Sequence, residues 1–337
     1  MPQIITVADA GTWGTALANL LALNGHQVQL LCYREEIATG INTDRRNPVY
    51  LTDLELPKNI TAITDLEAAL AHSETAYLVV PTRYLRPFIL DNIAVWQAWA
   101  RPGAVLCNCT KGLLLNPTER TDEWLARLFP AAALCHLAGP NFAKELAKGK
   151  LAAAVSAGPL RAAELVQSQL MSDNYRIYTG DDLVGVEVAG FYKNIIAIGA
   201  GAVTELSLGE NARAALVTRA LAEMGRLVDY FGGDPGTLAG LAGIGDLMLT
   251  CSSEMSRNFQ VGMRRARGQS LTQIQAEMKE VAEGIQAARA VHDWPSEHSL
   301  TDWPDLPLAS EVYQFLYGDE SAQESIKRLM RRPPKAE

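Results

Sequence analysis

The chain has few cysteines, and their arrangement excludes two classes of protein. Only five of its 337 residues are cysteine, and no two of them form a CxxC pair. An odd, scattered set of this kind is typical of reduced thiols rather than of a disulfide framework or a zinc site. We therefore expect free thiols, no bound metal and a cytoplasmic location.

Long apolar runs and excess positive charge are also lacking. A run such as residues 195–203 is far shorter than the roughly 18 residues that cross a bilayer, so we expect no integral membrane segment. Strand-like residues begin at position 4, which leaves no room for a signal peptide before them. The formal net charge of −8 disfavours nucleic acid as the main partner. These features predict a soluble, intracellular protein.

What is present at the N-terminus is an apolar strand, a turn containing glycine, and a helix rich in alanine and leucine at residues 15–23. In the turn, Gly11 would let the backbone approach a phosphate, and Gly14 would let helix and strand pack closely. The N–H groups and dipole of a helix N-terminus favour an anion there. The pattern predicts a dinucleotide-binding turn in which Asp9 replaces the usual first glycine.

Asp9 has two opposing consequences for this turn. Aspartate tolerates left-handed backbone angles better than most residues, so we expect the turn to form. Its carboxylate would repel a pyrophosphate unless it caps a nearby N–H group. We therefore expect a weakened but functional cofactor site.

Strand-like and helix-like segments alternate through the first half of the chain. The apolar runs lie at residues 4–8, 27–32, 76–80, 104–108 and 134–138, with helical stretches such as 66–71 and 121–128 between them. This alternation predicts an α/β fold with a Rossmann-like, doubly wound parallel sheet. Such sheets bind ligands beyond the carboxyl ends of their strands.

The second half of the chain has helical patterns throughout. A long helix of small residues is predicted from 182 to about 206, and further helices follow at 213–230, 254–267, 271–280 and 283–291. Residues 294–306 are interpreted as a loop and 327–337 as a basic, solvated tail. We expect a dinucleotide-binding domain at 1–181 and an all-helical substrate or catalytic domain at 182–337.

One lysine stands on an apolar helical face. The neighbours of Lys193 one turn away include Ala189 and Ala197. Poor solvation there would lower the pKa of Lys193 and suit it to proton transfer. The alternative is a lysine whose stem carries the ammonium group out to water.

Three further polar segments have both a functional and a structural interpretation. Asp246, in a glycine-rich apolar stretch, is either a site carboxylate or a helix N-cap. Ser256-Arg257-Asn258 suits a phosphate group, or forms an exposed loop. Asn141, which follows the predicted strand at 134–138, is either a ligand contact or a helix cap.

Together these segments resemble one family, the bacterial-type NAD(P)-dependent sn-glycerol-3-phosphate dehydrogenases, over nearly the whole chain. Many short motifs in one order carry the resemblance. Besides the N-terminal turn they are Asn47-Pro48, Val79-Val80-Pro81, Thr110-Lys111-Gly112, Gly139-Pro140-Asn141-Phe142-Ala143, Glu187-Val188-Ala189-Gly190, Lys193-Asn194, Gly243-Ile244-Gly245-Asp246, Ser256-Arg257-Asn258 and Val281-Ala282-Glu283-Gly284.

The resemblance implies hydride transfer between NAD or NADP and C2 of a phosphorylated triose. Dihydroxyacetone phosphate and sn-glycerol 3-phosphate would be interconverted, which feeds glycerophospholipid synthesis. Lys193 would be the general acid and base. Substrate contacts would be Lys111, Gly139, Asn141, Asn194, Asp246, Ser256, Arg257 and Asn258. Cofactor contacts would be Gly11, Thr12, Trp13, Gly14, Arg34, Lys111, Ala143, Arg257, Val281 and Glu283.

The position of Arg34 bears on the choice of cofactor. It lies 20 residues beyond Gly14, where an arginine accommodates the 2′-phosphate of NADP. We expect a preference for NADPH, which Glu35 and Glu36 would blunt. The resemblance leaves a homodimer open. Two alternatives stay open as well: a related reductase for another small hydroxy compound, and a nucleotide-binding sensor that has lost catalysis.

Overall fold

The computed structural model describes residues 2–278, 280–318 and 320–334, and the chain divides into two compact units. The first unit is Met1–Thr110 with Arg120–Leu183, and the second is Lys111–Glu119 with Val184–Glu337. The sequence-based boundary at residue 181 did not anticipate the segment Lys111–Glu119. This segment groups with the helical unit because α14 (Glu283–Glu297) holds it: Gln286 Nε2 donates to the Leu113 carbonyl (3.2 Å), and Glu297 accepts the Thr118 N–H (2.8 Å).

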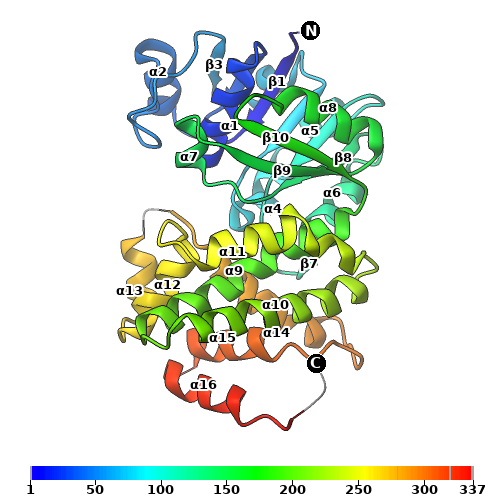
Figure 1. Cartoon of the computed structure of the whole chain (residues 1–337). Helices are drawn as coiled ribbons and strands as arrows, with labels where there is room; N and C mark the ends of the chain where they lie inside the picture. Colours follow the sequence, from blue (N-terminus) through cyan, green and yellow to red (C-terminus); the bar gives the residue numbers. More distant parts are fainter. Residues whose placement is uncertain (1, 279, 319, 335–337) are drawn as a thin grey trace. The chain divides into compact units, whose positions relative to one another are not determined.

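The first unit is built on an eight-stranded sheet in the order β10-β9-β8-β5-β4-β1-β2-β3 (Figure 1). Every neighbouring pair is parallel except β8 and β9, so the predicted fold class is confirmed with one antiparallel pair added. The strands are β1 (Ile4–Ala8), β2 (Gln27–Leu31), β3 (Ile60–Ile63), β4 (Thr75–Leu78), β5 (Val105–Asn108), β8 (Ala133–Ala138), β9 (Ala152–Ala157) and β10 (Tyr175–Gly180).

The strand order reverses at β1, which lies between β2 and β4. Right-handed crossovers therefore place α1 and α2 on one face and α3 to α6 on the other, which makes the sheet doubly wound. The helices of this unit are α1 (Thr12–Leu23), α2 (Glu35–Asp44), α3 (Leu66–Leu70), α4 (Thr82–Asp91), α5 (Ile93–Trp99), α6 (Thr121–Leu128), α7 (Ala143–Ala147) and α8 (Leu160–Leu170).

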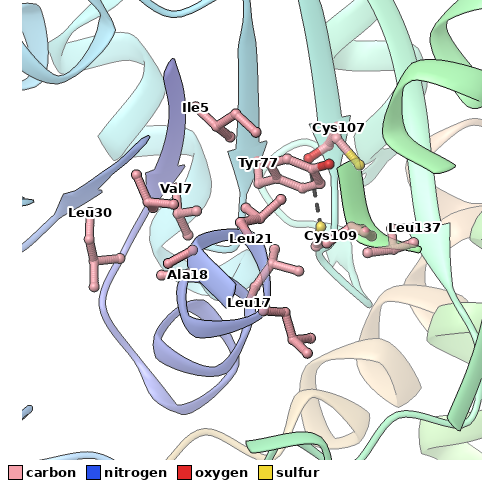
Figure 2. Close-up of a cluster of buried hydrophobic side chains, with 14 of the residues drawn as sticks. Ile5, Val7, Leu17, Ala18, Leu21, Leu30, Tyr77, Cys107, Cys109 and Leu137 are labelled. Atoms are coloured by element: carbon pink, nitrogen blue, oxygen red, sulfur yellow. Dashed lines mark hydrogen bonds between the residues drawn. The ribbon is translucent and has the colours of Figure 1, made fainter. Parts of the chain in front are cut away.

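Helix α1 packs on the sheet through a buried apolar core (Figure 2). Leu17 and Leu21 of α1 pack with Val7 and Leu30 of the neighbouring strands, and all four side chains are fully buried. Strands buried on both faces are typical of parallel sheets covered by helices. This packing holds the N-terminus of α1 beside the carboxyl end of β1, where the dinucleotide turn was predicted.

The second unit is helical, as predicted, although some helix bounds differ. Its helices are α9 (Leu183–Glu205), α10 (Glu210–Tyr230), α11 (Asp246–Cys251), α12 (Arg257–Ala266), α13 (Leu271–Glu277), α14 (Glu283–Glu297), α15 (Pro307–Tyr317) and α16 (Ala322–Met330), with a 3₁₀ turn at Pro235–Ala239 and a π-turn at Leu241–Gly245. Two-residue strands lie at β6 (Leu113–Leu114) and β7 (Glu119–Arg120).

Two sequence-based assignments in this unit are wrong in part. The predicted loop at 294–306 begins only after α14 ends at Glu297, because the buried Trp294 stacks on His298 and Trp303 and holds the last turn in place. The predicted tail at 327–337 begins as helix, because a capping box at Ser321 starts α16, which runs to Met330.

Helix α9 is the central helix of this unit. A Cβ on Gly201 would lie 2.0 Å from the Phe259 carbonyl oxygen, and one on Gly262 would lie 1.9 Å from that of Ile198. Glycine at both positions thus lets α9 and α12 touch backbone to backbone.

Within the described residues, α9 is also the one helix long and apolar enough to cross a membrane. The apolar run at residues 195–203 is only part of α9, which also contains Glu187 and Lys193. Its most apolar window is 83% buried inside the protein, as in the core helix of a soluble fold.

Candidate active site

The turn between β1 and α1 forms although its first glycine is absent. Asp9 adopts φ = 103°, in the left-handed region that aspartate tolerates better than most residues. Its carboxylate accepts the N–H of Gly11 at 3.3 Å. A Cβ on Gly14 would lie 1.9 Å from the Asp9 carbonyl oxygen, so only glycine allows α1 to approach the strand this closely. The turn is therefore shaped to bring backbone N–H groups to a phosphate.

The charge of Asp9 depends on pH in the physiological range. Burial raises the pKa of its carboxyl group to about 6, against the lowering effect of backbone hydrogen bonds from Gly11 and Ala10. At neutral pH the group is mostly ionised. The turn thus carries its own anion on the Gly11 N–H, close to where a pyrophosphate would be held.

A second residue supports the turn from behind. Asn47 is completely buried, and its Nδ2 donates to the Ala10 carbonyl and to Thr15 Oγ1, both at 2.9 Å. Its Oδ1 accepts the N–H groups of Val49 and Tyr50. Sequence reasoning noted Asn47 only as part of a motif and missed this role, because its partners in the turn lie more than 30 positions away.

The other predicted cofactor residues of the first unit lie at the same edge of the sheet. Thr12 and Trp13 are the first two residues of α1. Arg34 occupies the N-cap position of α2, just beyond β2, which pairs with β1. Its guanidinium group pairs with Glu36 at 2.8 Å and is about half exposed. A 2′-phosphate at this position would compete with Glu36 for Arg34.

The turn after β8 brings a third group of predicted residues to the carboxyl edge. Gly139 has φ = 142°, and a Cβ there would lie 2.8 Å from Ala154 Cα, so glycine is required. Phe142, not Asn141, is the N-cap of α7, which excludes the helix-cap alternative for Asn141. Among the described residues, Asn141 Oδ1 is buried without a hydrogen-bond partner. Ala143 is the first residue of α7.

In the second unit, Lys193 lies on α9 and is buried, with only 5% of the residue exposed. Its Nζ donates to Asp246 Oδ1 at 2.6 Å and to Thr250 Oγ1 at 2.8 Å. The alternative of a lysine reaching water is therefore wrong. Burial lowers the pKa of Lys193 to about 8; Asp246 opposes this shift, and Lys111 adds to it. Such an ammonium group can donate and recover a proton near neutral pH.

Asp246 holds two lysines at once. It is 1% exposed, and its Oδ2 accepts a hydrogen bond from Lys111 Nζ at 2.8 Å while Oδ1 binds Lys193. Burial alone would raise the pKa of Asp246, but the two ammonium groups outweigh it and hold the pKa below its usual value. Gly245, not Asp246, occupies the N-cap position of α11, so the cap alternative is wrong. One carboxylate between two cations leaves a net positive cluster, which suits an anionic substrate.

Thr250 is a site residue that sequence reasoning missed. Its hydroxyl binds Lys193 Nζ and donates to the Asp246 carbonyl at 2.6 Å. Thr250 lies four residues after Asp246 on α11, and positions i and i+4 share one helix face. That spacing was the signal that could have found it.

Two buried amides link the lysine cluster to the start of α14. Asn194 Nδ2 donates to the carbonyls of Lys111 (3.1 Å) and Gly190 (3.3 Å), and its Oδ1 accepts from Asn258 Nδ2 at 2.9 Å. Asn258 Oδ1 in turn accepts the Gly284 N–H at 2.9 Å. The two amides fix the backbone of Lys111 relative to α9, α12 and α14.

The segment Ser256-Arg257-Asn258 forms the start of α12, so the exposed-loop alternative is wrong. Ser256 is the N-cap, and its Oγ accepts the Phe259 N–H. The Arg257 guanidinium group lies 3.0 Å from Glu280 Oε2. Two predicted cofactor contacts, Val281 and Glu283, lie one and three positions after Glu280 in the sequence.

Each unit matches a family model. Residues 4–163 match the N-terminal domain, and residues 182–327 the C-terminal domain, of NAD-dependent glycerol-3-phosphate dehydrogenase. The chain belongs to the NAD-dependent glycerol-3-phosphate dehydrogenase family. It is therefore an NAD(P)-dependent oxidoreductase, which favours the predicted enzyme over a sensor without catalysis.

Individual relatives agree with this assignment over their full length. A glycerol-3-phosphate dehydrogenase [NAD(P)+] of Geobacter metallireducens is 41% identical, covering 100% of this chain and 99% of its own. One from Limosilactobacillus fermentum is 36% identical over 97% of both. The crystal structure of glycerol-3-phosphate dehydrogenase from Coxiella burnetii has a TM-score of 0.90 at 33% identity, covering 98% of this chain and 99% of that one.

Proposed function

We propose that this chain interconverts dihydroxyacetone phosphate and sn-glycerol 3-phosphate, with Lys193 as the general acid and base. The observation that carries the proposal is the buried Lys193, bonded to Asp246 and brought to a pKa of about 8. A proton donor of that pKa matches the step in which a carbonyl oxygen becomes a hydroxyl group. The product would feed glycerophospholipid synthesis.

The residues of the second unit have distinct parts in this reaction. In reduction, Lys193 Nζ gives its proton to the C2 oxygen, and in oxidation it takes that proton back. Lys111 supplies positive charge to the oxygen, and Asp246 holds both ammonium groups in place. The Thr250 hydroxyl accepts a second hydrogen bond from Lys193 Nζ, which restricts the orientation of the ammonium group. Arg257 and Asn258, with Ser256 at the N-terminus of α12, bind the phosphate end of the substrate.

The residues of the first unit fit a dinucleotide, because glycine at position 14 lets α1 pack closely on the strand and so places the N-terminus of α1 beside the turn. NAD(P)H, when bound, supplies the hydride. Gly11, Thr12 and Trp13 would hold the pyrophosphate at the start of α1, and Arg34 the 2′-phosphate. Since Glu36 already pairs with Arg34, we propose a preference for NADPH rather than an exclusive use of it.

One assay tests this proposal. Oxidation of NADPH or NADH is followed by absorbance after dihydroxyacetone phosphate is added, with unphosphorylated dihydroxyacetone as the comparison substrate. We expect turnover with the phosphate ester and a higher kcat/KM with NADPH. Equal turnover of both substrates would instead favour a reductase for another hydroxy compound, and a clear preference for NADH would assign Glu35 or Glu36 to the ribose.

Arg257→Lys should raise KM for dihydroxyacetone phosphate roughly tenfold, or about 1.4 kcal/mol. Lysine keeps the charge but loses the fork that grips two phosphate oxygens. KM for unphosphorylated dihydroxyacetone should change little. Arg264→Lys, a change of the same kind in α12 at an arginine paired with Glu277, serves as the control. Equal effects of Arg257→Lys on both substrates would show that Arg257 does not bind the phosphate.

Asp9→Gly should tighten NADPH binding at pH 7, most clearly at low salt. Two like charges about 6 Å apart repel by roughly 3 kcal/mol at an effective dielectric constant near 20, before screening reduces this. Because the pKa of Asp9 is about 6, the advantage of the variant should shrink as pH falls below that value. Calorimetry with NAD⁺, which carries no titrating 2′-phosphate, checks the pH dependence. Unchanged or weaker binding in Asp9→Gly would make Asp9 a purely structural turn residue.

We further propose a cytoplasmic location. All five cysteines are free and buried, which suits a reducing compartment, and the apolar helix α9 is buried inside the protein.

Assembly as a homodimer stays a prediction. Size-exclusion chromatography with light scattering would test it.

A further inference from the structure

The guanidinium group of Arg257, the first residue of α12, already pairs with an anion, and that anion belongs to the protein. Glu280 Oε2 lies 3.0 Å from Arg257 Nη1, with side chains that are 30% and 49% exposed. Arg257 is the first residue of α12, where the N–H groups and the helix dipole also favour negative charge. Glu280 is thus paired with the guanidinium group that we assign to the substrate phosphate.

The segment that carries Glu280 is held in place from its other end. The Gly284 N–H donates to Asn258 Oδ1, and a Cβ on Gly284 would lie 2.4 Å from the Asn194 carbonyl oxygen. The start of α14 therefore lies directly against the neighbours of Arg257 and Lys193. Only three residues separate Glu280 from this anchor, so its carboxylate stays within reach of α12.

We propose that Glu280 is an internal counter-anion that the substrate phosphate must displace from Arg257, and that it thereby sets the affinity of the enzyme for phosphorylated substrates. This inference rests on the proposed phosphate-binding role of Arg257. A dianionic phosphate offers more charge and more acceptor oxygens than one carboxylate, so it displaces the Glu280 carboxylate from Arg257. The exchange nevertheless costs part of the binding energy of the phosphate. Glu280 acts through Arg257 and is a positioning residue rather than a catalytic one.

The size of the effect follows from the exposure of the pair. Ion pairs this exposed contribute little because water and salt screen them. Removing Glu280 should therefore tighten phosphate binding by about two- to fivefold at low salt, which corresponds to at most about 1 kcal/mol. The effect should shrink in high salt, because the Debye length falls to about 3 Å at 1 M.

The test compares Glu280→Gln with Glu277→Gln in the full-length protein. Both substitutions remove one negative charge from neighbouring positions and break an ion pair with an arginine of α12, but Glu277 pairs with Arg264 instead of Arg257. The dissociation constant of inorganic phosphate is measured by calorimetry, and KM is measured for dihydroxyacetone phosphate and for unphosphorylated dihydroxyacetone. A second pair of proteins carries Arg257→Gln with and without Glu280→Gln.

We expect Glu280→Gln to lower both the phosphate dissociation constant and KM for the phosphate ester, and to leave KM for dihydroxyacetone unchanged. Glu277→Gln should resemble the unmodified protein, and Glu280→Gln should have no effect once Arg257 is glutamine. Equal shifts in the two glutamate variants would overturn the proposal, because they would reflect overall charge. No shift in Glu280→Gln, or no phosphate binding in any protein, would also overturn it.

Failure of the proposed reaction would look different. In that case dihydroxyacetone phosphate would not be reduced, while inorganic phosphate would still bind more tightly to Glu280→Gln. The binding experiment thus tests the counter-anion separately from the assigned activity.

Discussion

Lys193→Ala is expected to lower kcat for the reduction of dihydroxyacetone phosphate by about 10²–10⁴-fold, the usual contribution of a positioned acid or base. Lys193 is hydrogen-bonded to Asp246 and Thr250, and none of these three residues is a predicted cofactor contact. Binding of NADPH, measured by fluorescence or calorimetry, should therefore survive the substitution. Lys327→Ala, a change at an exposed lysine, serves as the control. Near-normal kcat in Lys193→Ala would show that Lys193 is not the general acid and base.

The pH profile of the unmodified protein gives a second readout of Lys193. Its pKa is about 8, and it must be protonated to act as the acid. The kcat of reduction should therefore fall as pH rises through about 8, whereas the kcat of glycerol phosphate oxidation should rise over the same range. A profile for reduction that stays flat from pH 7 to pH 9 would contradict this role.

Sequence reasoning placed those site residues whose chemistry conflicts with their surroundings. Lys193 stands out because a charged side chain lies on an apolar helical face, and Asp246 because a carboxylate interrupts a glycine-rich stretch. Such conflicts are visible along the chain. The pairing of these residues with their partners cannot be seen in the sequence, because the hydrogen bond between Lys111 and Asp246, for example, joins residues 135 positions apart. The roles of Thr250 and Asn47 were missed since each is an ordinary polar residue until its partners are known.

The strands of the sheet also divide into those that could be predicted from the sequence and those that could not. The buried strands β1, β5 and β8 were predicted because they are mostly apolar runs, as is typical of a parallel sheet. Strands β3, β9 and β10 were missed. β9 is mostly alanine, and the outer strand β10 alternates buried Tyr175 and Ile177 with exposed Arg176 and Tyr178, which breaks the apolar run.

Asp246→Asn is expected to change both catalysis and stability, because Asp246 is the carboxylate shared by Lys193 and Lys111. Asparagine keeps the size of the side chain but removes its charge. An opposite charge at this distance typically shifts a pKa by about one to three units. Without it, the pKa of Lys193 should fall further below 8, and the decline of the reduction kcat with pH should move to lower pH by a similar amount. At pH 7, between half and nearly all of the acid would then be deprotonated, and kcat should fall roughly 2- to 100-fold.

Thr250→Val is the matched control for this pH shift. It removes a hydrogen bond from Lys193 but leaves every charge in place. Its pH profile should therefore stay close to that of the unmodified protein even if its kcat falls. The same displacement of the profile in Thr250→Val and Asp246→Asn would mean that packing, rather than the Asp246 charge, sets the pKa of Lys193.

The stability of Asp246→Asn should depend on pH in a direction that identifies Lys193 as the cause. Removing one partner of a buried ion pair costs about 3–5 kcal/mol, because a charge is left buried without compensation. Lys193 can reduce this cost by releasing its proton, and it does so more readily as pH rises. In the variant, the unfolded chain then binds more protons than the folded one from below pH 8 upward, so its stability rises with pH from there. In the unmodified protein the same rise begins only near pH 8, where its Lys193 titrates. The stability difference, measured by urea unfolding, should therefore be largest near pH 6 and shrink as pH approaches 8. A difference that stays constant over that range would show that Lys193 keeps its proton without Asp246.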